Sequence, residues 1–331
     1  MDIKHVLILF GGRSSEHEVS LSSAKNVVEA IDKNKYTVSM VTISRAGKWQ
    51  KVDNVREAND DDTPVVVDLN EGIFVAGDEK IKPDVVFPVL HGKYGEDGTL
   101  QGMLDLMGMS YVGCGVEASA ICMDKIRTKR LLAAVGIPVV RDRIATNLNF
   151  NVADLPGPWF VKPSRAGSSV GVTKVKDANL LAVAVESALA HDSEVLIEMA
   201  VQHPRELEVA VMGNMPNVIT SAVGEIIPGE EFYNYDDKYT ATSTSQVIEK
   251  ADLPNELNDT IRDIAEQAYD VLNCRGLARV DFLLSGNGEL YVNEVNTMPG
   301  FTNSSMFPKL MMKAGYSYPQ LIDKLIELAL Q

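Results

Sequence analysis

With 331 residues, 45% of them hydrophobic and 23% charged, the chain has the composition of a globular protein and room for two or three domains. Its formal net charge of −15 disfavours a nucleic-acid partner, and its apolar runs fall well short of the roughly 20 residues that span a bilayer, so we expect no membrane partner either. The cysteines, Cys114, Cys122 and Cys274, lack a Cys-x-x-Cys spacing and are typical of thiols in a reducing cytoplasm.

Strand-like and helical segments alternate from the N-terminus to about residue 121. The first, KHVLILF at 4–10, is interpreted as a buried strand and not as a signal peptide, because Gly-Gly-Arg follows it without a cleavage site. A helix, two further strands and a second helix follow in EHEVSLSSAKNVVEAI, YTVSMVTIS, DVVFPVLHG and TLQGMLDLMGM. This alternation predicts an open, mostly parallel α/β sheet, with the polar residues 53–82 as a peripheral excursion.

After a helix in MDKIRTKRLLAAVG, the chain has the pattern of a second, smaller domain. A strand, a loop, a strand, a helix and a strand follow in GPWFVKP, the Gly-Ser loop, VGVTKV, ANLLAVAVESALA and EVLIEMAV. ELEVAVMG and AVGEII then alternate like antiparallel strands, before a helix near 255–273, a strand pair and a C-terminal amphipathic helix. The stretch 228–247 has no sustained period, and a loop of this length is often a lid.

The stretch WFVKPSRAGSSVGVTKV, at 159–175, has a Gly-Ser-Ser core between two apolar, β-branched runs. Such a loop is suited to holding an anion through its backbone N–H groups. It is not a P-loop, because no Gly-Lys-Ser/Thr follows and Val170 to Val175 is predicted to be a strand. We therefore expect a phosphate site that closes a β-hairpin.

Two alternating runs flank Ser-Gly-Asn-Gly in GLARVDFLLSGNGELYVNEVNTMPG, which is a strong hairpin signal. If the loop is Asn287-Gly288, Asp281 opposes Glu294 and Arg279 opposes Asn296. A four-residue loop would instead set Arg279 against Glu294. Either register places these four side chains on one face, because side chains alternate with a period of two.

Directly opposed carboxylates lie about 5 Å apart and repel each other, which leaves three interpretations of this face. The face is solvated, or Arg279 neutralises the acids, or a divalent cation lies between Asp281 and Glu294 with Asn296 as a third oxygen ligand. Oxygen ligands suit Mg²⁺, which also binds substrate phosphates. Because the Gly-Ser loop is predicted to bind phosphate, it favours the third interpretation, a divalent cation between the acids.

The order and number of several sequence blocks identify a family. The chain resembles the D-alanine–D-alanine ligases of the ATP-grasp superfamily almost from end to end, in GGRSSEHEVSL, HGKYGEDGTLQGMLDLMGMSYVG, MDKIRTK, VKPSRAGSSVGV, GEIIPGEEFYNYDDKY, RVDFLL and NEVNTMPGFTNSSMFPKL. The resemblance implies a Rossmann-like α/β substrate domain at 1–121, a central ATP-grasp lobe at 122–212 and a C-terminal ATP-grasp lobe at 213–331. It also implies a cytoplasmic, ADP-forming enzyme that joins two D-alanines through an acyl phosphate for peptidoglycan synthesis.

The resemblance also implies a set of nucleotide contacts. The ATP-binding residues would be Lys125, Lys162, Gly167, Ser169, Glu198, Met199, Val201 and Glu206. The two lysines would contact phosphates, and Glu198 begins the segment that reads adenine through backbone groups. Many relatives carry Lys where this chain has Met199. Glu206 would bind the ribose hydroxyls, with Glu208 as the alternative.

The resemblance also implies the catalytic and substrate-binding residues. The catalytic residues would be Glu16, Ser168, Tyr239, Arg279 and Gly300, and the substrate-binding residues His91, Lys238, Ser305 and Met306. Glu16 would fix the ammonium of the first D-alanine, although an acid at a helix start is also favoured by the helix dipole. Ser305 would help to hold the second carboxylate, and it is also a typical helix N-cap. Arg279 and the Gly300 N–H would stabilise the oxyanion.

The resemblance further implies cofactors and alternatives. Asp281, Glu294 and Asn296 would hold two Mg²⁺ or Mn²⁺ ions per site, with K⁺ as an activator and a homodimer as the assembly. Tyr239, in FYNYDDKY, favours an amine over D-lactate as second substrate, so a D-alanine–D-lactate ligase is the alternative within the superfamily. A dinucleotide-dependent oxidoreductase is disfavoured, because the chain lacks G-x-G-x-x-G.

Overall fold

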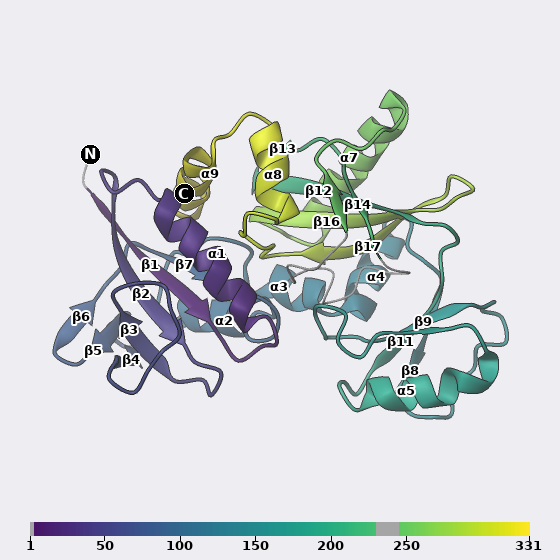
Figure 1. Cartoon of the computed structure of the whole chain (residues 1–331), viewed down its shortest axis with the longest axis horizontal. Coiled ribbons are helices and arrows are strands. Elements are labelled where there is room, and N and C mark those ends of the chain that lie inside the picture. Colours follow the sequence, from purple (N-terminus) through teal and green to yellow (C-terminus); the bar gives the residue numbers. More distant parts are fainter. Residues whose placement is uncertain (1–2, 230–244) are drawn as a thin grey trace.

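The computed structural model describes residues 3–229 and 245–331. In these ranges the strands form three sheets. The helix α3 (Val116–Met123) lies between the first sheet and the third, and α4 (Lys125–Ala134) lies between the third sheet and the second (Figure 1). The mixed α/β fold class predicted from the sequence is confirmed. The division of the chain into domains at residues 121 and 212 stays a prediction.

The first sheet has seven strands in the order β6-β5-β4-β3-β2-β1-β7. Their bounds are β1 (Lys4–Gly11), β2 (Tyr36–Ile43), β3 (Trp49–Val52), β4 (Thr63–Asp68), β5 (Ile73–Ala76), β6 (Glu79–Ile81) and β7 (Val85–Val89). Parallel pairing is confined to β2, β1 and β7, and β3 to β6 continue the sheet in antiparallel order. The predicted mostly parallel sheet is therefore wrong for its outer half.

The length of the connections explains this difference. A parallel crossover needs about a dozen residues, whereas β4, β5 and β6 are joined through residues 69–72 and 77–78 alone. Connections this short allow only antiparallel hairpins. The predicted excursion at 53–82 is at the periphery, as expected, but it supplies the three outermost strands on one side of the sheet, β4, β5 and β6.

The strand β1 is buried on both faces, which accounts for its continuous apolar run. Val6, Ile8 and Phe10 pack in one core with α1 (His17–Ala30) and with the C-terminal helices α8 (Met306–Lys313) and α9 (Tyr318–Ala329). Leu7 and Leu9 pack on the other face with α2 (Thr99–Leu106). The C-terminus of the chain therefore returns to the N-terminal sheet (Figure 1).

The second sheet is antiparallel, in the order β10-β9-β11-β8. Its strands are β8 (Asp142–Ala145), β9 (Trp159–Pro163), β10 (Thr173–Val175) and β11 (Val195–Met199), and η1 (Ala178–Leu180) leads into α5 (Leu181–Leu189). α5 packs its apolar side on this sheet. The Gly-Ser loop joins β9 to β10, so the predicted hairpin is confirmed, although its second strand begins only at Thr173.

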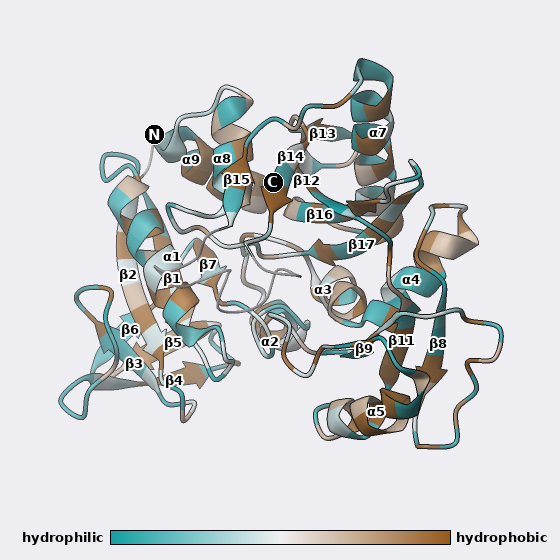
Figure 2. Cartoon of the chain, turned by 45° about the vertical axis from the view of Figure 1, so that its right-hand side comes forward, coloured by the Kyte–Doolittle hydropathy of each residue, from teal (hydrophilic) through white to brown (hydrophobic). Residues whose placement is uncertain are grey.

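The third sheet has the order β15-β14-β12-β16-β17, and β13 also pairs with β12. Its strands are β12 (Arg205–Asn214), β13 (Asn217–Thr220), β14 (Gly224–Ile227), β15 (Gln246–Ile248), β16 (Gly276–Leu284) and β17 (Leu290–Asn296). Along β12, Val209 and Val211 pack under α7 (Asn255–Val271), whereas Ala210 and Met212 face α8. Figure 2 shows that α7 and α1 carry both hydrophobic and hydrophilic residues, as helices that cover a sheet should.

None of the helices in the described part of the chain combines the length and the apolar character that a membrane crossing requires.

The docking of α9 on the first sheet gives a stability prediction. Leu325 of α9 is fully buried in the core that also contains β1 and α1. Leu325→Ala should lower the free energy of unfolding by about 2–5 kcal/mol, because it leaves a cavity where buried carbon atoms were. Urea denaturation followed by circular dichroism measures this change. Leu330→Ala is the control, since Leu330 is 38% exposed, and it should change the value by less than about 0.5 kcal/mol. Equal, small effects of both changes would contradict the docking.

Candidate active site

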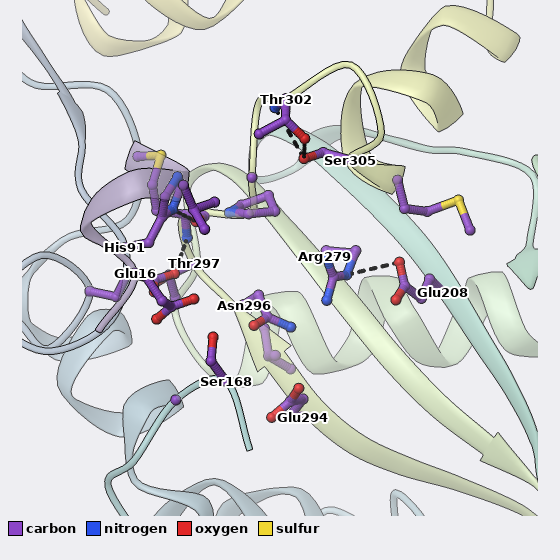
Figure 3. A pocket seen from close by; sticks show the side chains of 18 of the residues that line it. Glu16, His91, Ser168, Glu208, Arg279, Glu294, Asn296, Thr297, Thr302 and Ser305 are labelled. Atoms are coloured by element: carbon purple, nitrogen blue, oxygen red, sulfur yellow. Dashed lines mark hydrogen bonds and ion pairs between the residues drawn. The ribbon is translucent and has the colours of Figure 1, made fainter. Parts of the chain in front are cut away.

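A cavity of about 750 Å³ is lined by segments from all three sheets. Figure 3 shows Glu16 and His91 on one side, Ser168 below them, and Arg279, Glu294 and Asn296 on the strands opposite. The predicted site residues that line the cavity are Glu16, His91, Lys125, Gly167, Ser168, Arg279, Glu294, Asn296, Gly300, Ser305 and Met306. The structure therefore brings together residues up to 290 positions apart in the sequence.

The Gly-Ser loop packs directly against Glu16. A Cβ atom on Gly167 would lie 3.1 Å from Oε2 of Glu16, and one on Gly92 would lie 2.5 Å from the same oxygen. Glycine at these two positions lets two backbones approach the carboxylate from different sides. Ser168 and Ser169 have φ angles of 49° and 60°, the left-handed region, which turns the chain sharply at the cavity. Glu16 and the loop that contains Ser168 therefore lie side by side at the cavity.

Lys125 and the Gly-Ser loop hold each other in place. The Lys125 ammonium donates a hydrogen bond of 2.8 Å to the Ala166 carbonyl, and its Nζ lies 4.0 Å from Oε2 of Glu294. One lysine therefore connects the loop to the acidic hairpin across the cavity. A cation at this point is suited to contact a phosphate bound between the two elements.

The β16–β17 hairpin has the strand register predicted for a loop at Asn287-Gly288, with Asp281 opposite Glu294 and Arg279 opposite Asn296. The loop itself differs. Leu284 pairs with Leu290, so the connection includes Ser285 to Glu289 and the pairing shifts by one residue between Asp281 and Phe282. This bulge restores the predicted pairing of the acids.

Arg279 neutralises its face of the hairpin. Its guanidinium donates two hydrogen bonds of 2.7 Å to Asp281 and lies 3.1 Å from Oε2 of Glu208. Asn296 donates a further bond of 2.9 Å to Asp281. Burial opposes the charge on Arg279, but the ion pairs with Asp281 and Glu208 outweigh it and raise the pKa of Arg279. Of the three interpretations, the solvated face is wrong, because Asp281 is buried.

The oxygen atoms of this face are compatible with a magnesium ion. In the described ranges no group of three or more His, Cys, Asp or Glu side chains is arranged as a metal site. The candidate set instead has two carboxylates and one amide, Asp281, Glu294 and Asn296. Mg²⁺ commonly uses one or two carboxylates and completes its shell with waters and substrate phosphates. The residues therefore fit an ion that binds together with a nucleotide.

The buried His91 and the half-buried Glu96 form a polar cluster beside Glu16. His91 Nδ1 forms a hydrogen bond of 3.0 Å with the Met298 carbonyl, and its Nε2 forms one of 3.1 Å with the Ser23 hydroxyl. Burial lowers the pKa of His91, so the imidazole is neutral near pH 7. Glu96 accepts bonds from the N–H groups of Gly92, at 2.5 Å, and Met298, at 3.1 Å.

The sequence reasoning missed Glu96 as a functional residue, although it lies in the quoted block HGKYGEDG. Burial, and then the nearby charge of Glu16, raise the pKa of Glu96 to about 8. This carboxyl group therefore holds a proton at neutral pH, and its two backbone bonds tie the loop after β7 to the segment after β17.

Ser305 lies at the N-cap position of α8, but its hydroxyl does not cap the helix. It accepts a bond from Thr302 N–H at 3.1 Å and lies 2.7 Å from the Thr302 hydroxyl (Figure 3). Met306 is the first residue of α8 and is buried. The first turn of α8 thus faces the cavity together with Gly300.

The predicted nucleotide residues Lys162, Glu198, Met199, Val201 and Glu206 do not line the cavity and lie on or next to β9, β11 and β12. Lys162 forms an ion pair of 2.5 Å with Glu198, and burial is outweighed by the partner charges, which raise the pKa of Lys162. The backbone N–H of Met199 donates a hydrogen bond to the Arg141 carbonyl, and Val201 lies just after the end of β11. Glu206 lies two residues before Glu208 on β12. Since Glu208 faces Arg279, Glu206 stays the preferred ribose-binding candidate.

The other predicted residues have no structural account. Lys238, Tyr239 and most of the predicted lid at 228–247 lie outside the described residues.

Two family descriptions match the chain, "D-ala D-ala ligase N-terminus" over residues 5–114 and "D-ala D-ala ligase C-terminus" over residues 133–327. The chain is 44% identical to a D-alanine–D-alanine ligase of Shouchella clausii, over 99% of this chain and 95% of the relative. It is 45% identical to one of Acetivibrio thermocellus, over 100% and 96%. A solved VanG D-Ala:D-Ser ligase from Enterococcus faecalis superposes with a TM-score of 0.89 at 38% identity, covering 99% of this chain and 100% of that one. The D-alanine–D-alanine ligase of Coxiella burnetii gives 0.88 at 34%, covering 100% and 94%.

The raised pKa of Glu96 predicts a pH-dependent stability. A carboxyl group whose folded-state pKa lies above its unfolded value stabilises the fold fully below the unfolded pKa, near 4.5, and loses this contribution as pH rises through about 8. Glu96→Gln has no proton to lose. The free energy of unfolding of wild type minus that of Glu96→Gln should therefore fall between pH 5 and 8, by up to about 1.4 kcal/mol per pH unit.

Urea denaturation of both proteins at pH 5, 6.5 and 8 measures this difference. Glu256→Gln, at an exposed acid in the first turn of α7, is the control and should show no such trend. A difference for Glu96→Gln that is constant across the pH range would show that Glu96 is ionised throughout.

Proposed function

The chain belongs to the D-alanine–D-alanine ligase family, and we propose that it uses ATP to join two D-alanines into D-alanyl-D-alanine, with ADP and phosphate as the other products. The observation that carries this proposal is the single cavity in which Glu16, the Gly-Ser loop and the acidic hairpin meet. An amino-acid site, a phosphate-binding loop and a cation site must be adjacent if ATP is to phosphorylate the carboxylate of an amino acid.

Phosphorylation of the first D-alanine is the first step. A carboxylate is a poor electrophile, so its oxygen attacks the γ-phosphorus of ATP, the bond to the β-phosphate oxygen breaks, and an acyl phosphate forms. Glu16 holds the substrate ammonium, and Lys125 and Lys162 offset the charge on the phosphoryl group. Backbone N–H groups of the loop around Gly167, Ser168 and Ser169 orient the phosphates.

The same site then forms the peptide bond. The amine of the second D-alanine attacks the acyl carbon, and phosphate leaves from the tetrahedral intermediate. Arg279, which Asp281 and Glu208 hold in place, and the Gly300 N–H stabilise the oxyanion. Ser305 and Met306, at the start of α8, bind the carboxylate of the second D-alanine, because the N-terminus of a helix favours an anion.

Further parts of the proposal rest on the family. Asp281, Glu294 and Asn296 hold two Mg²⁺ or Mn²⁺ ions, which supply positive charge to the phosphoryl oxygens when bound. Lys238, Tyr239 and the segment 228–247 cover the site, together with Ser168, and exclude water that would hydrolyse the acyl phosphate. Glu198, Met199, Val201 and Glu206 bind the nucleoside. We also propose a cytoplasmic homodimer, activation by K⁺ and a role in peptidoglycan synthesis.

The substrate assignment predicts a pattern of phosphate release. The chain with ATP and Mg²⁺ should release phosphate when D-alanine is added, and not with L-alanine. With limiting D-alanine, neither D-lactate nor D-serine should increase the rate as much as further D-alanine does. D-serine is included because the VanG relative is a D-Ala:D-Ser ligase. Lys162→Met should lower kcat/KM for ATP by at least about tenfold, whereas Lys80→Met, at the edge strand β6, should not change it. A lack of stimulation by D-alanine would refute the proposal.

The cation site predicts a metal requirement. Glu294→Gln should raise the Mg²⁺ concentration for half-maximal activity by about 10- to 100-fold, because it removes one charged oxygen ligand. Glu289→Gln, at the far end of the same hairpin and exposed, is the matched control and should leave that concentration unchanged. The same Mg²⁺ requirement in both variants would place the ion elsewhere.

A further inference from the structure

A fully buried lysine, Lys129 of α4, lies behind the nucleotide-binding residues and has no part in the mechanism described so far. Its side chain is 2% exposed. Its ammonium donates a bond of 2.6 Å to the Val140 carbonyl, forms an ion pair with Oε1 of Glu198, and lies 3.6 Å from Oδ1 of Asp142. A charge this deep in a protein is costly unless it compensates others.

The strand register shows why a positive charge is needed here. Glu198 of β11 and Asp142 of β8 are directly opposite each other in an antiparallel pair. Two opposed carboxylates destabilise a sheet, and here both side chains are almost completely buried. The Lys129 ammonium reaches both of them from α4, on the same side of the sheet.

Glu198 forms ion pairs with two lysines, Lys129 and Lys162, whose side chains differ in solvent exposure. Its Oε2 pairs with Lys162 at 2.5 Å, whereas its Oε1 pairs with Lys129. Burial would raise the pKa of Glu198, but the two ammonium groups outweigh it and lower that pKa to about 2. The Lys162 side chain is 15% exposed and also feels the charges of Glu294 and Glu206. Lys162 is therefore the partner with access to a ligand.

Among the cations that contact Asp142 and Glu198, Lys162 is the one that these two acids can release without losing their balance of charge. Asp142 also forms two hydrogen bonds with Arg130, at 3.1 and 2.6 Å. Lys129, Lys162 and Arg130 thus face two carboxylates, Asp142 and Glu198. If Lys162 turns to an anionic ligand, Lys129 and Arg130 still balance both acids. Without Lys129, the cluster would need Lys162 for its own neutrality.

We propose that Lys129 is a positioning residue for ATP binding, which keeps Glu198 neutralised so that Lys162 is released to the phosphates of the nucleotide. This role rests on the proposed function, because it takes Lys162 as a phosphate-binding lysine. It acts through Glu198 and touches neither substrate nor reacting atoms. In Lys129→Met, Glu198 retains Lys162 as its sole counter-ion, and the nucleotide has to compete for that lysine.

Paired variants test this role. Lys129→Met should raise both KM for ATP and the Kd of a non-hydrolysable ATP analogue, by on the order of tenfold, and should change KM for D-alanine by less than about twofold. Adding Glu198→Gln to Lys129→Met should return the Kd to that of Glu198→Gln alone, within about threefold, because Lys162 is then free of the carboxylate. Gln keeps an acceptor oxygen at that position.

Adding Asp142→Asn to Lys129→Met is the matched control. It removes the same charge from the same cluster but leaves Glu198 ionised, so the Kd should stay high. A role in fold stability alone predicts that both double variants recover equally, and that outcome would overturn the proposal, as would an unchanged Kd in Lys129→Met. If Lys129→Met does not fold, the Kd values of the two double variants still distinguish the two roles. Their melting temperatures show whether both double variants are folded. If Lys162→Met leaves the Kd unchanged, the proposed phosphate contact itself fails, which is a separate result.

Discussion

Buried carboxylates need partners of opposite charge, and this requirement shapes the region where the three sheets meet. Arg279 holds Asp281 of its own strand and Glu208 of the neighbouring strand, so one guanidinium fixes two acids from β16 and β12. On the other side of the site, Lys129 and Lys162 share Glu198. Because an unpaired buried charge costs several kcal/mol, these groups can change partners only when a ligand supplies replacement charge. A metal-bound triphosphate would supply charge of both signs.

The same region also depends on contacts between distant parts of the chain. Ser23 of α1 forms a hydrogen bond with His91 and accepts a hydrogen bond of 3.0 Å from the Phe301 N–H. Glu96 ties Gly92 to Met298, and Asn26 donates a bond of 2.9 Å to the Phe301 carbonyl. The segment after β17 is therefore anchored to the first sheet at several points. These hydrogen bonds fix the side of the cavity that contains Glu16 and His91 relative to the β16–β17 hairpin, and the proposed two-substrate reaction requires such proximity.

Local patterns in the sequence predicted the parts of the site that depend on local geometry. The period-two alternation in RVDFLL and LYVNEVN predicted the face shared by Arg279, Asp281, Glu294 and Asn296, because neighbouring strands of a hairpin determine that face. The loop was predicted less well: it extends from Ser285 to Glu289, and an unpaired residue in β17 shifts the register so that the acids pair as predicted. The strands β4, β5 and β6 were missed because each has only three to six residues, too few for an alternation to be recognised.

Lys129 and Glu96 were beyond the reach of sequence patterns for another reason. Each resembles an ordinary surface residue of a helix or loop, and its partners come from segments tens to hundreds of positions away. The return of α9 to the N-terminal core has the same character, because amphipathic periodicity shows that a helix covers something but not what it covers. The roles of the individual site residues rest on the family and on their convergence in one cavity.

The central claim is that the Gly-Ser loop and the β16–β17 hairpin enclose a magnesium–triphosphate. A crystal structure of the chain with Mg²⁺ and a non-hydrolysable ATP analogue tests it most directly. The account predicts the phosphates between Lys125, Lys162 and the loop at Ser168, with Asp281 and Glu294 as ligands of the metal. A nucleotide bound outside the cavity, or a metal shell without either acid, would contradict it.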